Sequence, residues 1–234
     1  MYIDVDPEKT DNPLLLIINT ANQQEFNRKW SIRIRQIPCK SRYRAPPGCL
    51  QYYTGKNGNV ESFNYRTTTL PVTTTTPLPN GGNFQQVPVA TANGNLIAAN
   101  YLNNLNYGVC IARAPNMCAI KWSAIEFDFG AVQTLSASTP SSQCVQQSNA
   151  LATDDDFLLI PFGTDRTSGI YVDRFCGQRF STSISQQGSE LNTDVYSYNS
   201  PYALYVHTDN KAINDNNNVQ NQKGFFLKYS QVPC

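Results

Sequence analysis

The chain has 234 residues, of which 40% are hydrophobic, and its 18 Lys and Arg against 17 Asp and Glu leave a formal net charge of +1. These apolar side chains suffice for a packed core, which excludes a disordered chain. Because no basic run or stripe occurs, the composition also excludes nucleic acids and anionic membrane surfaces as partners. The longest uninterrupted apolar run covers residues 14–18 and is far too short to span a bilayer.

Two segments near the start of the chain recur at its end. Residues 13–22, PLLLIINTAN, resemble residues 201–210, PYALYVHTDN, and residues 30–39, WSIRIRQIPC, resemble residues 225–234, FFLKYSQVPC. The paired segments keep the same order and finish on the same Pro-Cys. A repeat of this kind indicates two copies of one structural module, of which the first is present only in part.

The repeat divides the chain into three parts. We expect residues 1–39 to form the last strands of a first module, residues 40–48 to be a linker, and residues 49–234 to form a complete second module. Met1 is followed by acidic residues, where a secretory signal would be basic and then apolar. Since the first module lacks its other strands, we expect further sequence ahead of Met1.

Short apolar runs bounded by Gly, Pro, Asn, Asp or Ser follow one another along the chain, with no sustained helical period. In chain order they are LLLII at 14–18, WSIRIRQI at 30–37, IEFDF at 125–129, FLLIPF at 157–162, GIYVDRF at 169–175, YALYV at 202–206 and FFLKY at 225–229. These runs predict an all-β fold, an antiparallel β-sandwich in which each of two sheets buries one face.

An insertion rich in Thr and Pro interrupts this pattern at about residues 66–95, where TTTLPVTTTTPLPNGG is followed by a mixture of Gln, Asn and Ala. This composition cannot bury enough apolar surface to belong to a core. We expect a protruding segment, either an O-glycosylated, mucin-like spike or a tolerated surface loop. The Asn-rich residues 214–221 predict a second loop.

The cysteines and the single histidine limit the chemistry of the chain. Seven cysteines are present with no C-x-x-C spacing, and His207 is the only histidine. A zinc site is therefore disfavoured, whereas disulfides in an oxidising, secretory compartment fit. The odd count leaves one cysteine without a partner in the chain. Because no G-x-S-x-G motif accompanies it, His207 is interpreted as structural and not as part of a catalytic triad.

Seven motifs in order carry a resemblance to a known family. They are GCLQYYTG, GNVESFNY, NYGVCIARAPNMCAIKWSAIEFDF, a cysteine ahead of DDDFLLIPFG, DRFCG, YVHTDN and GFFLKY. Together they resemble the CUB domain, a disulfide-linked β-sandwich of extracellular proteins, over residues 49–234. Residues 1–39 resemble the last strands of a preceding CUB-like copy, as in tandem-CUB proteins of invertebrates.

The resemblance implies a disulfide framework for the second module. The family's two bridges fall, in order, on Cys49 with Cys110 and on Cys144 with Cys176. We also expect a third bridge between Cys118 and Cys234. Cys39 is then the cysteine without a partner.

Many CUB domains bind calcium through loop carboxylates at one end of the sandwich and dock a basic side chain of a partner beside it. Matched residue by residue, the family's ligands fall on Asp156 and Asp209, which would also form the partner-binding surface. The family's third ligand, a glutamate, has no match, because Asn103, Asn104 and Asn106 occupy that stretch. The alternative is that the acidic run ending at Asp156 is a solvated turn. In the first copy, Ala21 stands where the equivalent of Asp209 would be, so we expect no calcium there.

An enzymatic interpretation rests on Glu126 and Asp128. Alternate residues of a strand share a face, so the two carboxylates would lie side by side, as in retaining glycosidases. IEFDFG also faintly resembles the E-x-D-x-x-E strand of jelly-roll glycoside hydrolases, but Gly130 and Ala131 follow and the second glutamate is missing. An exposed polar face of a CUB strand is therefore favoured over a catalytic pair.

We therefore predict an extracellular, non-enzymatic module that binds another protein, with no cofactor required. A carbohydrate-active β-sandwich enzyme and a calcium-dependent, sugar-binding lectin remain as alternatives. Hydrolysis of β-glucans would distinguish the enzyme, and calcium-dependent binding to a glycan array would distinguish the lectin.

Overall fold

The structure of the chain is a computed structural model. It describes residues 1–5, 15–18, 31–41, 43–65, 101–130, 144, 156–177, 179–182, 192–209 and 223–234 with their side chains, and residues 73–76 and 85–88 by their backbone. Every regular element in these ranges is a β-strand. No described residue belongs to an apolar helix long enough to cross a membrane.

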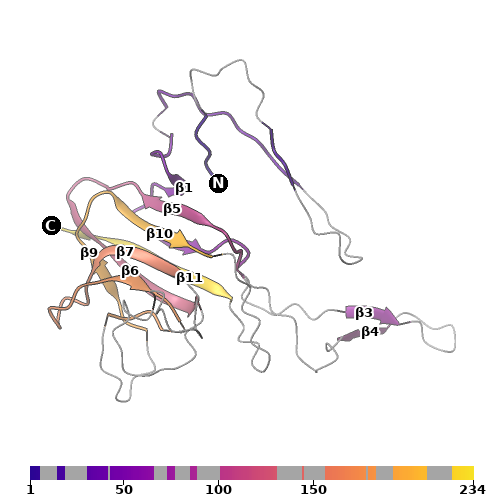
Figure 1. The fold of residues 1–234 in the computed structure, drawn as a ribbon. Helices are drawn as coiled ribbons and strands as arrows, with labels where there is room; N and C mark the ends of the chain where they lie inside the picture. Colours follow the sequence, from indigo (N-terminus) through magenta and orange to yellow (C-terminus); the bar gives the residue numbers. More distant parts are fainter. Residues whose placement is uncertain are drawn as a thin grey trace.

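The first sheet has five strands in the order β1-β5-β10-β7-β8 (Figure 1). These strands are β1 (Cys49–Tyr53), β5 (Asn106–Ile111), β10 (Tyr202–His207), β7 (Phe157–Gly163) and β8 (Val172–Phe175). Neighbours are antiparallel except for the parallel pair β1 and β5. β10 lies at the centre and pairs with both β5 and β7, which brings residues from distant parts of the chain to the same sheet ends.

The second sheet has four antiparallel strands in the order β2-β11-β6-β9. These strands are β2 (Asn57–Glu61), β11 (Gly224–Pro233), β6 (Met117–Asp128) and β9 (Val195–Ser197). A separate hairpin of β3 (Thr73–Thr76) and β4 (Gln85–Pro88) falls within the Thr/Pro-rich segment. Figure 1 shows it at a distance from the two sheets, so the backbone of these eight residues agrees with a protruding insertion.

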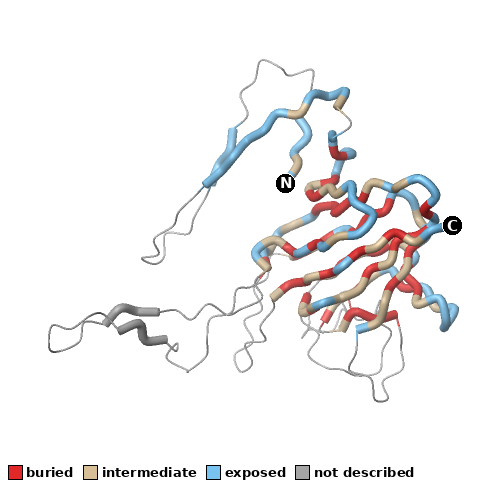
Figure 2. The backbone as a smooth tube through the Cα atoms, turned by 180° about the vertical axis from the view of Figure 1, so that it is seen from behind, coloured by how far each residue is buried: buried red, intermediate tan, exposed pale blue. Residues whose placement is uncertain are grey.

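The core fills the space between the two sheets. Along β11, Phe225, Leu227 and Tyr229 are buried while Lys228 between them is exposed, because successive side chains of a strand point to opposite faces. Trp122 on the neighbouring β6 is fully buried and lies 6.0 Å from Tyr229, measured between ring centroids. Buried residues therefore follow the strands, as Figure 2 shows, and the prediction of an all-β antiparallel sandwich is confirmed.

The N-terminal residues differ from the expectation drawn from their pattern. The described residues 15–18 and 31–38 form no strand, and Leu15, Ile17 and Ile34 are exposed. A strand needs a neighbour for its N–H and C=O groups, and these segments lie beside neither sheet (Figure 1). The prediction of strands there is wrong for this structure, and the assignment of residues 1–39 to a first module stays a prediction.

Candidate functional site

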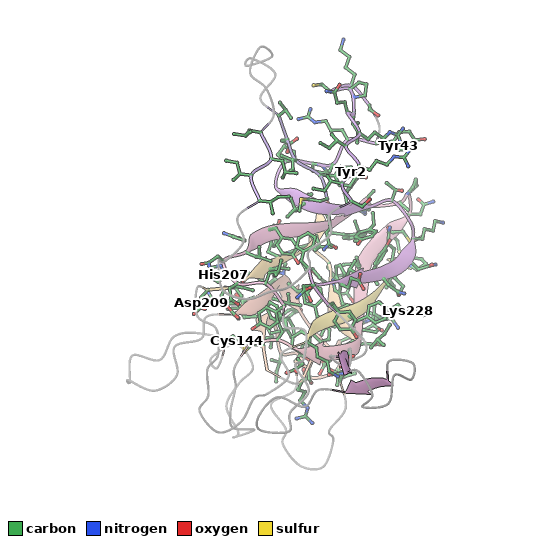
Figure 3. The ribbon with its side chains drawn as sticks, turned by 90° about the vertical axis from the view of Figure 1, so that its right-hand side faces the viewer. Tyr2, Tyr43, Cys144, His207, Asp209 and Lys228 are labelled. Carbon is green, nitrogen blue, oxygen red and sulfur yellow. A yellow bond between two sulfur atoms is a disulfide. The ribbon has the colours of Figure 1, made fainter. Side chains whose placement is uncertain are left out.

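Asp156 and Asp209 meet at one end of the sandwich. Asp156 directly precedes β7, and Asp209 follows β10 by two residues. β7 and β10 are antiparallel with Phe157 opposite His207, so the start of one strand and the end of the other share a sheet end. Figure 3 shows Asp209 close to His207 at this end and Lys228 on the far side of the molecule. We call Asp156, Asp209 and the loop of residues 101–105 the acidic end.

The carboxylate of Asp156 holds the acidic end together. Asp156 is only 2% exposed. Its Oδ1 accepts a 2.6 Å hydrogen bond from the backbone N–H of Asp209, and its Oδ2 accepts a 2.5 Å bond from the hydroxyl of Tyr101. The Tyr101 oxygen in turn accepts a 3.0 Å bond from the N–H of Gly130. Each oxygen of the buried carboxylate is therefore satisfied by a donor, which a buried acid requires.

Gly130 allows the end of β6 in the second sheet to approach the backbone of Asp156 closely. Its φ is +81°, and a Cβ at this position would lie 2.7 Å from the backbone oxygen of Asp156 and 3.4 Å from Cβ of Cys176. The preceding residue, Phe129, exchanges two backbone hydrogen bonds with Gly177, of 2.9 and 2.6 Å. The end of β6 is thus joined to the segment after β8, and only glycine combines this φ with this close approach.

The loop before β5 is bound to the same end. The side-chain oxygen of Thr208 accepts a 2.8 Å hydrogen bond from the N–H of Leu105 and donates a 3.0 Å bond to the carbonyl of Leu102. The N–H of Asn104 donates a 2.8 Å bond to the carbonyl of Asp209. Asn104, one of the asparagines that stand where the family has a third acid, therefore lies directly beside Asp209.

The fit of these residues to calcium is incomplete. Among the described residues, no three His, Cys, Asp or Glu side chains come together as a metal site. Asp156 and Asp209 supply two carboxylates, and both oxygens of Asp156 already accept hydrogen bonds within the protein. The neighbouring Asn104 carries no charge and cannot replace the third carboxylate. A hard cation that takes six to eight oxygens gains less from this set than from three carboxylates.

Glu126 and Asp128 lie on the outer face of the second sheet. Glu126 accepts a 2.6 Å hydrogen bond from Nζ of Lys223 and a 2.5 Å bond from the hydroxyl of Tyr65. Burial alone would raise the pKa of Glu126, but these two bonds and the charge of Lys223 outweigh it and lower the pKa. Burial raises the pKa of Asp128 to about 6, and the negative charge of Glu126 adds to this. Both oxygens of Glu126 are occupied, which is the arrangement of a structural ion pair and not of a free nucleophile.

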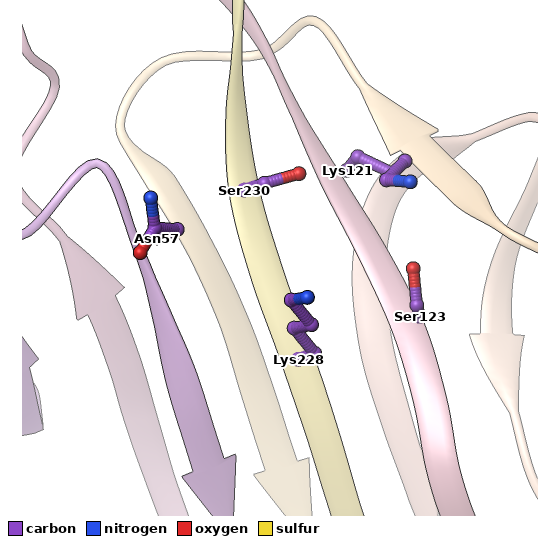
Figure 4. Close-up of a pocket in the computed structure, with 5 residues that line it drawn as sticks. All are labelled: Asn57, Lys121, Ser123, Lys228 and Ser230. Atoms are coloured by element: carbon purple, nitrogen blue, oxygen red, sulfur yellow. The ribbon is translucent and has the colours of Figure 1, made fainter.

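A shallow hollow on the same face is lined by other side chains. Figure 4 shows Asn57 on β2, Lys228 and Ser230 on β11, and Lys121 and Ser123 on β6. The carboxylate of Asp194 bonds both Lys121, at 3.0 Å, and Ser123, at 2.5 Å. Glu126 and Asp128 do not line this hollow, so the described hollow does not bring a substrate to the two acids.

The cysteines pair as the sequence analysis expects. Disulfides join Cys49 to Cys110, Cys118 to Cys234 and Cys144 to Cys176, and Cys39 is exposed and free. The only histidine, His207, lies with its ring 5.0 Å from that of Phe157, measured between centroids, which suits the structural role expected for it.

Tyr101 and Gly130 are the site residues that the sequence did not reveal. Tyr101 lies between the Thr/Pro-rich insertion and β5, outside every strand-like run named from the sequence. Gly130 directly follows an apolar strand-like run, where a glycine normally indicates only a turn. Their importance depends on contacts with Asp156, which is distant in sequence.

A five-stranded sheet facing a four-stranded one, with three disulfides and a loop cluster at one end, defines a disulfide-linked β-sandwich domain of the kind found outside cells. The family model for the animal CUB domain matches residues 46–232, so the chain belongs to the CUB domain family. Domains of this family are typically extracellular and generally act as protein interaction modules and not as enzymes. A comparison with curated proteins gives no match.

Proposed function

We propose that this protein is an extracellular, non-enzymatic module that binds a partner protein through its acidic end. The observation that carries the proposal is the hydrogen bond from the N–H of Asp209 to the buried carboxylate of Asp156, at 2.6 Å. It fixes the partly exposed Asp209 at the rim of a rigid sandwich. Loops held by a rigid scaffold are where binding residues concentrate, because little ordering entropy is lost on binding.

The charge of the acidic end suggests the chemistry of the partner. Asp209 is an acid at the rim, with the uncharged Asn104 beside it. A lysine or arginine on the partner would complement this arrangement. Because an ion pair at a rim is screened by salt, we expect binding to weaken as ionic strength rises.

No cofactor is required for this function in our proposal, and calcium has an assisting role at most. Asp156 is satisfied by Tyr101 and Asp209 without a cation. Calcium that binds at this end would use the carboxylates of Asp156 and Asp209, with amide or backbone oxygens in place of the third acid.

Thermal melts in millimolar calcium and in a chelator test the calcium role. A ligand of the native state raises the melting midpoint by mass action, so binding with a millimolar Kd gives only a small rise at millimolar calcium. Any rise should disappear in an Asp209→Asn variant. Identical midpoints in the two buffers would remove calcium from the proposal and leave the protein interaction.

Recovery of partners from native extracellular fluid tests the binding surface. We compare the wild type with Asp209→Asn, which keeps the backbone N–H that bonds Asp156, and with the double variant Asp156→Ala, Asp209→Ala. Asp173→Asn on β8 is the matched control, since it removes one exposed carboxylate elsewhere. We expect Asp209→Asn to weaken recovery about fivefold, because a rim charge contributes roughly 1 kcal/mol. Equal recovery by all variants at the same salt concentration would show that the partner binds elsewhere.

The enzymatic and lectin alternatives have their own assays. The ion pair between Glu126 and Lys223 opposes a nucleophilic role for Glu126, so we expect no hydrolysis of a β-glucan panel. Hydrolysis that is lost in Glu126→Gln would establish the enzyme. Binding to a glycan array that requires calcium and fails in Asp209→Asn would establish the lectin.

A further inference from the structure

Three exposed aromatic residues belong to adjoining segments at the end of the sandwich opposite the acidic end. Phe162 and Tyr171 are each 64% exposed and Tyr198 is 52% exposed. The rings of Phe162 and Tyr171 are 6.5 Å apart between centroids and nearly perpendicular. We call these three residues the aromatic cluster.

Tyr198 lies on a segment that adjoins the segment of Phe162. Thr164 and Tyr196 form an isolated antiparallel bridge, so the segment that carries Phe162 runs beside the segment that carries Tyr198. The hydroxyl of Ser197 donates a 2.6 Å hydrogen bond to the carbonyl of Pro161, which holds the two segments together at this point. Phe162 therefore contacts Tyr171 directly, and its segment adjoins the segment of Tyr198.

Phe162 has a strained backbone in this position. Its φ is +51°, in the left-handed region that a bulky residue rarely adopts, and it lies where the register between β7 and β8 shifts. Its side chain is mostly exposed, so core packing does not compensate for this strain. Strained residues that the surrounding structure nevertheless maintains cluster at binding sites and active sites.

The adjoining loop is held rigid by its own hydrogen bonds. Oδ1 of Asp165 accepts bonds from the N–H of Thr167, at 2.8 Å, and from the N–H and hydroxyl of Ser168, at 2.8 and 2.9 Å. The N–H of Ile170 donates a 3.2 Å bond to the hydroxyl of Ser168. The loop between β7 and β8 projects from the sandwich with residues 166–169 exposed (Figures 1 and 2). Its shape is therefore established before any partner binds.

Arg166 adds an available positive charge next to the aromatic cluster. Its guanidinium carbon lies 5.0 Å from the ring centroid of Tyr196, a cation–π distance, and its backbone also has a positive φ of 71°. The carboxylate nearest in sequence, Asp165, is bonded to the loop, and no described residue forms an ion pair with Arg166. A planar guanidinium held on a ring presents its N–H donors in the fork that matches a carboxylate.

We infer that the aromatic cluster and Arg166 form a second docking surface, which binds an acidic segment of a partner protein that also carries an aromatic or aliphatic side chain. Aromatic residues and arginine are the residue types that dominate the binding energy of protein interfaces. Because no carboxylate among the described residues pairs with Arg166, its positive charge favours an acidic partner. β7 has seven residues, so roughly 20 Å separates this surface from the acidic end, and both can be occupied at once.

The probe for this surface is a phage-displayed library of random 12-residue peptides, selected on the wild-type protein and counter-selected on a Phe162→Ala, Tyr171→Ala variant. We expect the selected peptides to combine Asp or Glu with an aromatic or aliphatic residue. Their Kd should rise at least tenfold in Phe162→Ala and about fivefold in Arg166→Met, which should also lose most of the salt dependence. Tyr205→Ala is the control, because Tyr205 is an exposed aromatic on β10 outside the cluster, and it should bind as the wild type does.

A Phe162→Gly variant separates binding from folding. Glycine adopts a positive φ without strain, so this variant should melt at or above the wild-type midpoint while peptide binding is lost. A clearly lower midpoint would show that Phe162 serves the fold, and would overturn the inference. So would selected peptides without acidic residues, peptides whose binding ignores Phe162 and Arg166, or Phe162-dependent binding only to glycans or to phospholipid vesicles.

Discussion

The N–H of Asp209 donates its hydrogen bond to Oδ1 of Asp156, a residue 53 positions earlier in the chain, at 2.6 Å. Both residues stand at the end of a strand, and their strands are neighbours in one sheet. The bond therefore joins the backbone of Asp209 to the side chain of Asp156. It does not require the two negative carboxylates to contact each other. Substitutions around this contact test how the acidic end is built.

Tyr101→Phe should destabilise the protein by about 2 kcal/mol, because it leaves a buried carboxylate oxygen and the N–H of Gly130 without their shared partner. The free energy of unfolding in urea measures the change. Tyr65→Phe is the matched control: its hydroxyl also bonds a carboxylate, but one that Lys223 neutralises and that is partly exposed, so its loss should cost about 0.5–1 kcal/mol. Equal losses would show that Asp156 is better solvated than its burial indicates.

Gly130→Ala should cost about 3 kcal/mol, since the new Cβ would both oppose a φ of +81° and lie 2.7 Å from the backbone oxygen of Asp156. Gly169→Ala has a comparable φ of +69° with no atom within 4 Å of the added Cβ. Gly169→Ala should therefore lower the free energy of unfolding by only about 1 kcal/mol, because the positive φ is unfavourable for alanine but no steric clash is added. Thermal and urea unfolding of both variants measure the difference, and a smaller loss in Gly130→Ala than in Gly169→Ala would contradict the close approach of the two sheets.

Asp128→Asn should stabilise the protein at pH 7 and have little effect at pH 4. Burial raises the pKa of Asp128 from 3.8 to about 6. Between pH 3.8 and pH 6, Asp128 is therefore protonated in the folded state and ionised in the unfolded state. Stability from this residue is thus present below pH 4 and is lost as the pH rises through 6. Since part of the side chain reaches solvent, we expect a gain of about 1 kcal/mol at pH 7.

Glu126→Gln should show the opposite pH dependence. The pKa of Glu126 is lowered, because the bonds from Lys223 and Tyr65 outweigh the effect of burial, so its contribution is present above pH 4.5 and is lost as the pH falls through its folded pKa. The variant should be less stable than the wild type at pH 7, with the difference shrinking in acid. Urea unfolding of Asp128→Asn and Glu126→Gln across pH 3 to 8 provides the comparison, and parallel curves would contradict the two pKa directions.

Native protein should have one thiol that reacts with a labelling reagent, Cys39, because the other six cysteines form disulfides. Non-reducing peptide mapping should recover Cys118 joined to Cys234.

Replacing Cys118 and Cys234 by Ala should lower the free energy of unfolding more than replacing Cys144 and Cys176 by Ala. The bridges span 116 and 32 residues, for which the chain-entropy model gives roughly 5 and 4 kcal/mol. A map that joins Cys39 to any of the six would contradict this framework.

Short apolar runs bounded by turn residues were sufficient to predict the sandwich. On β11 the run from Phe225 to Tyr229 is almost continuously apolar, yet its burial alternates in the structure, since the period of a strand is two. The same rule failed at residues 15–18 and 31–38, which have strand composition but lie beside neither sheet. A strand is defined by hydrogen bonds to a neighbour, and composition contains no information about whether that neighbour is present.

Some residues of the candidate site were identified from the sequence, and others only from the structure. Asp156 and Asp209 were identified from ordered motifs, because each lies next to a strand whose pattern is recognisable. The role of Tyr101 was not, because its hydroxyl acts on a carboxylate 55 residues away. The aromatic cluster was also missed, since Phe162 and Tyr171 sit within strand-like runs whose residues are expected to be buried.

The sequence by itself determined the all-β class, the family and the cysteine framework, all of which depend on local pattern or on ordered motifs, while the role of Asp156 and Asp209 as a binding site stays a prediction. Only the tertiary structure decided that Asp156 is a buried hydrogen-bond acceptor, that Glu126 is neutralised by Lys223 and that Phe162 points outward. The physical reason is that burial, pairing and backbone strain are properties of segments brought together from distant positions, so they arise only once the two sheets have packed.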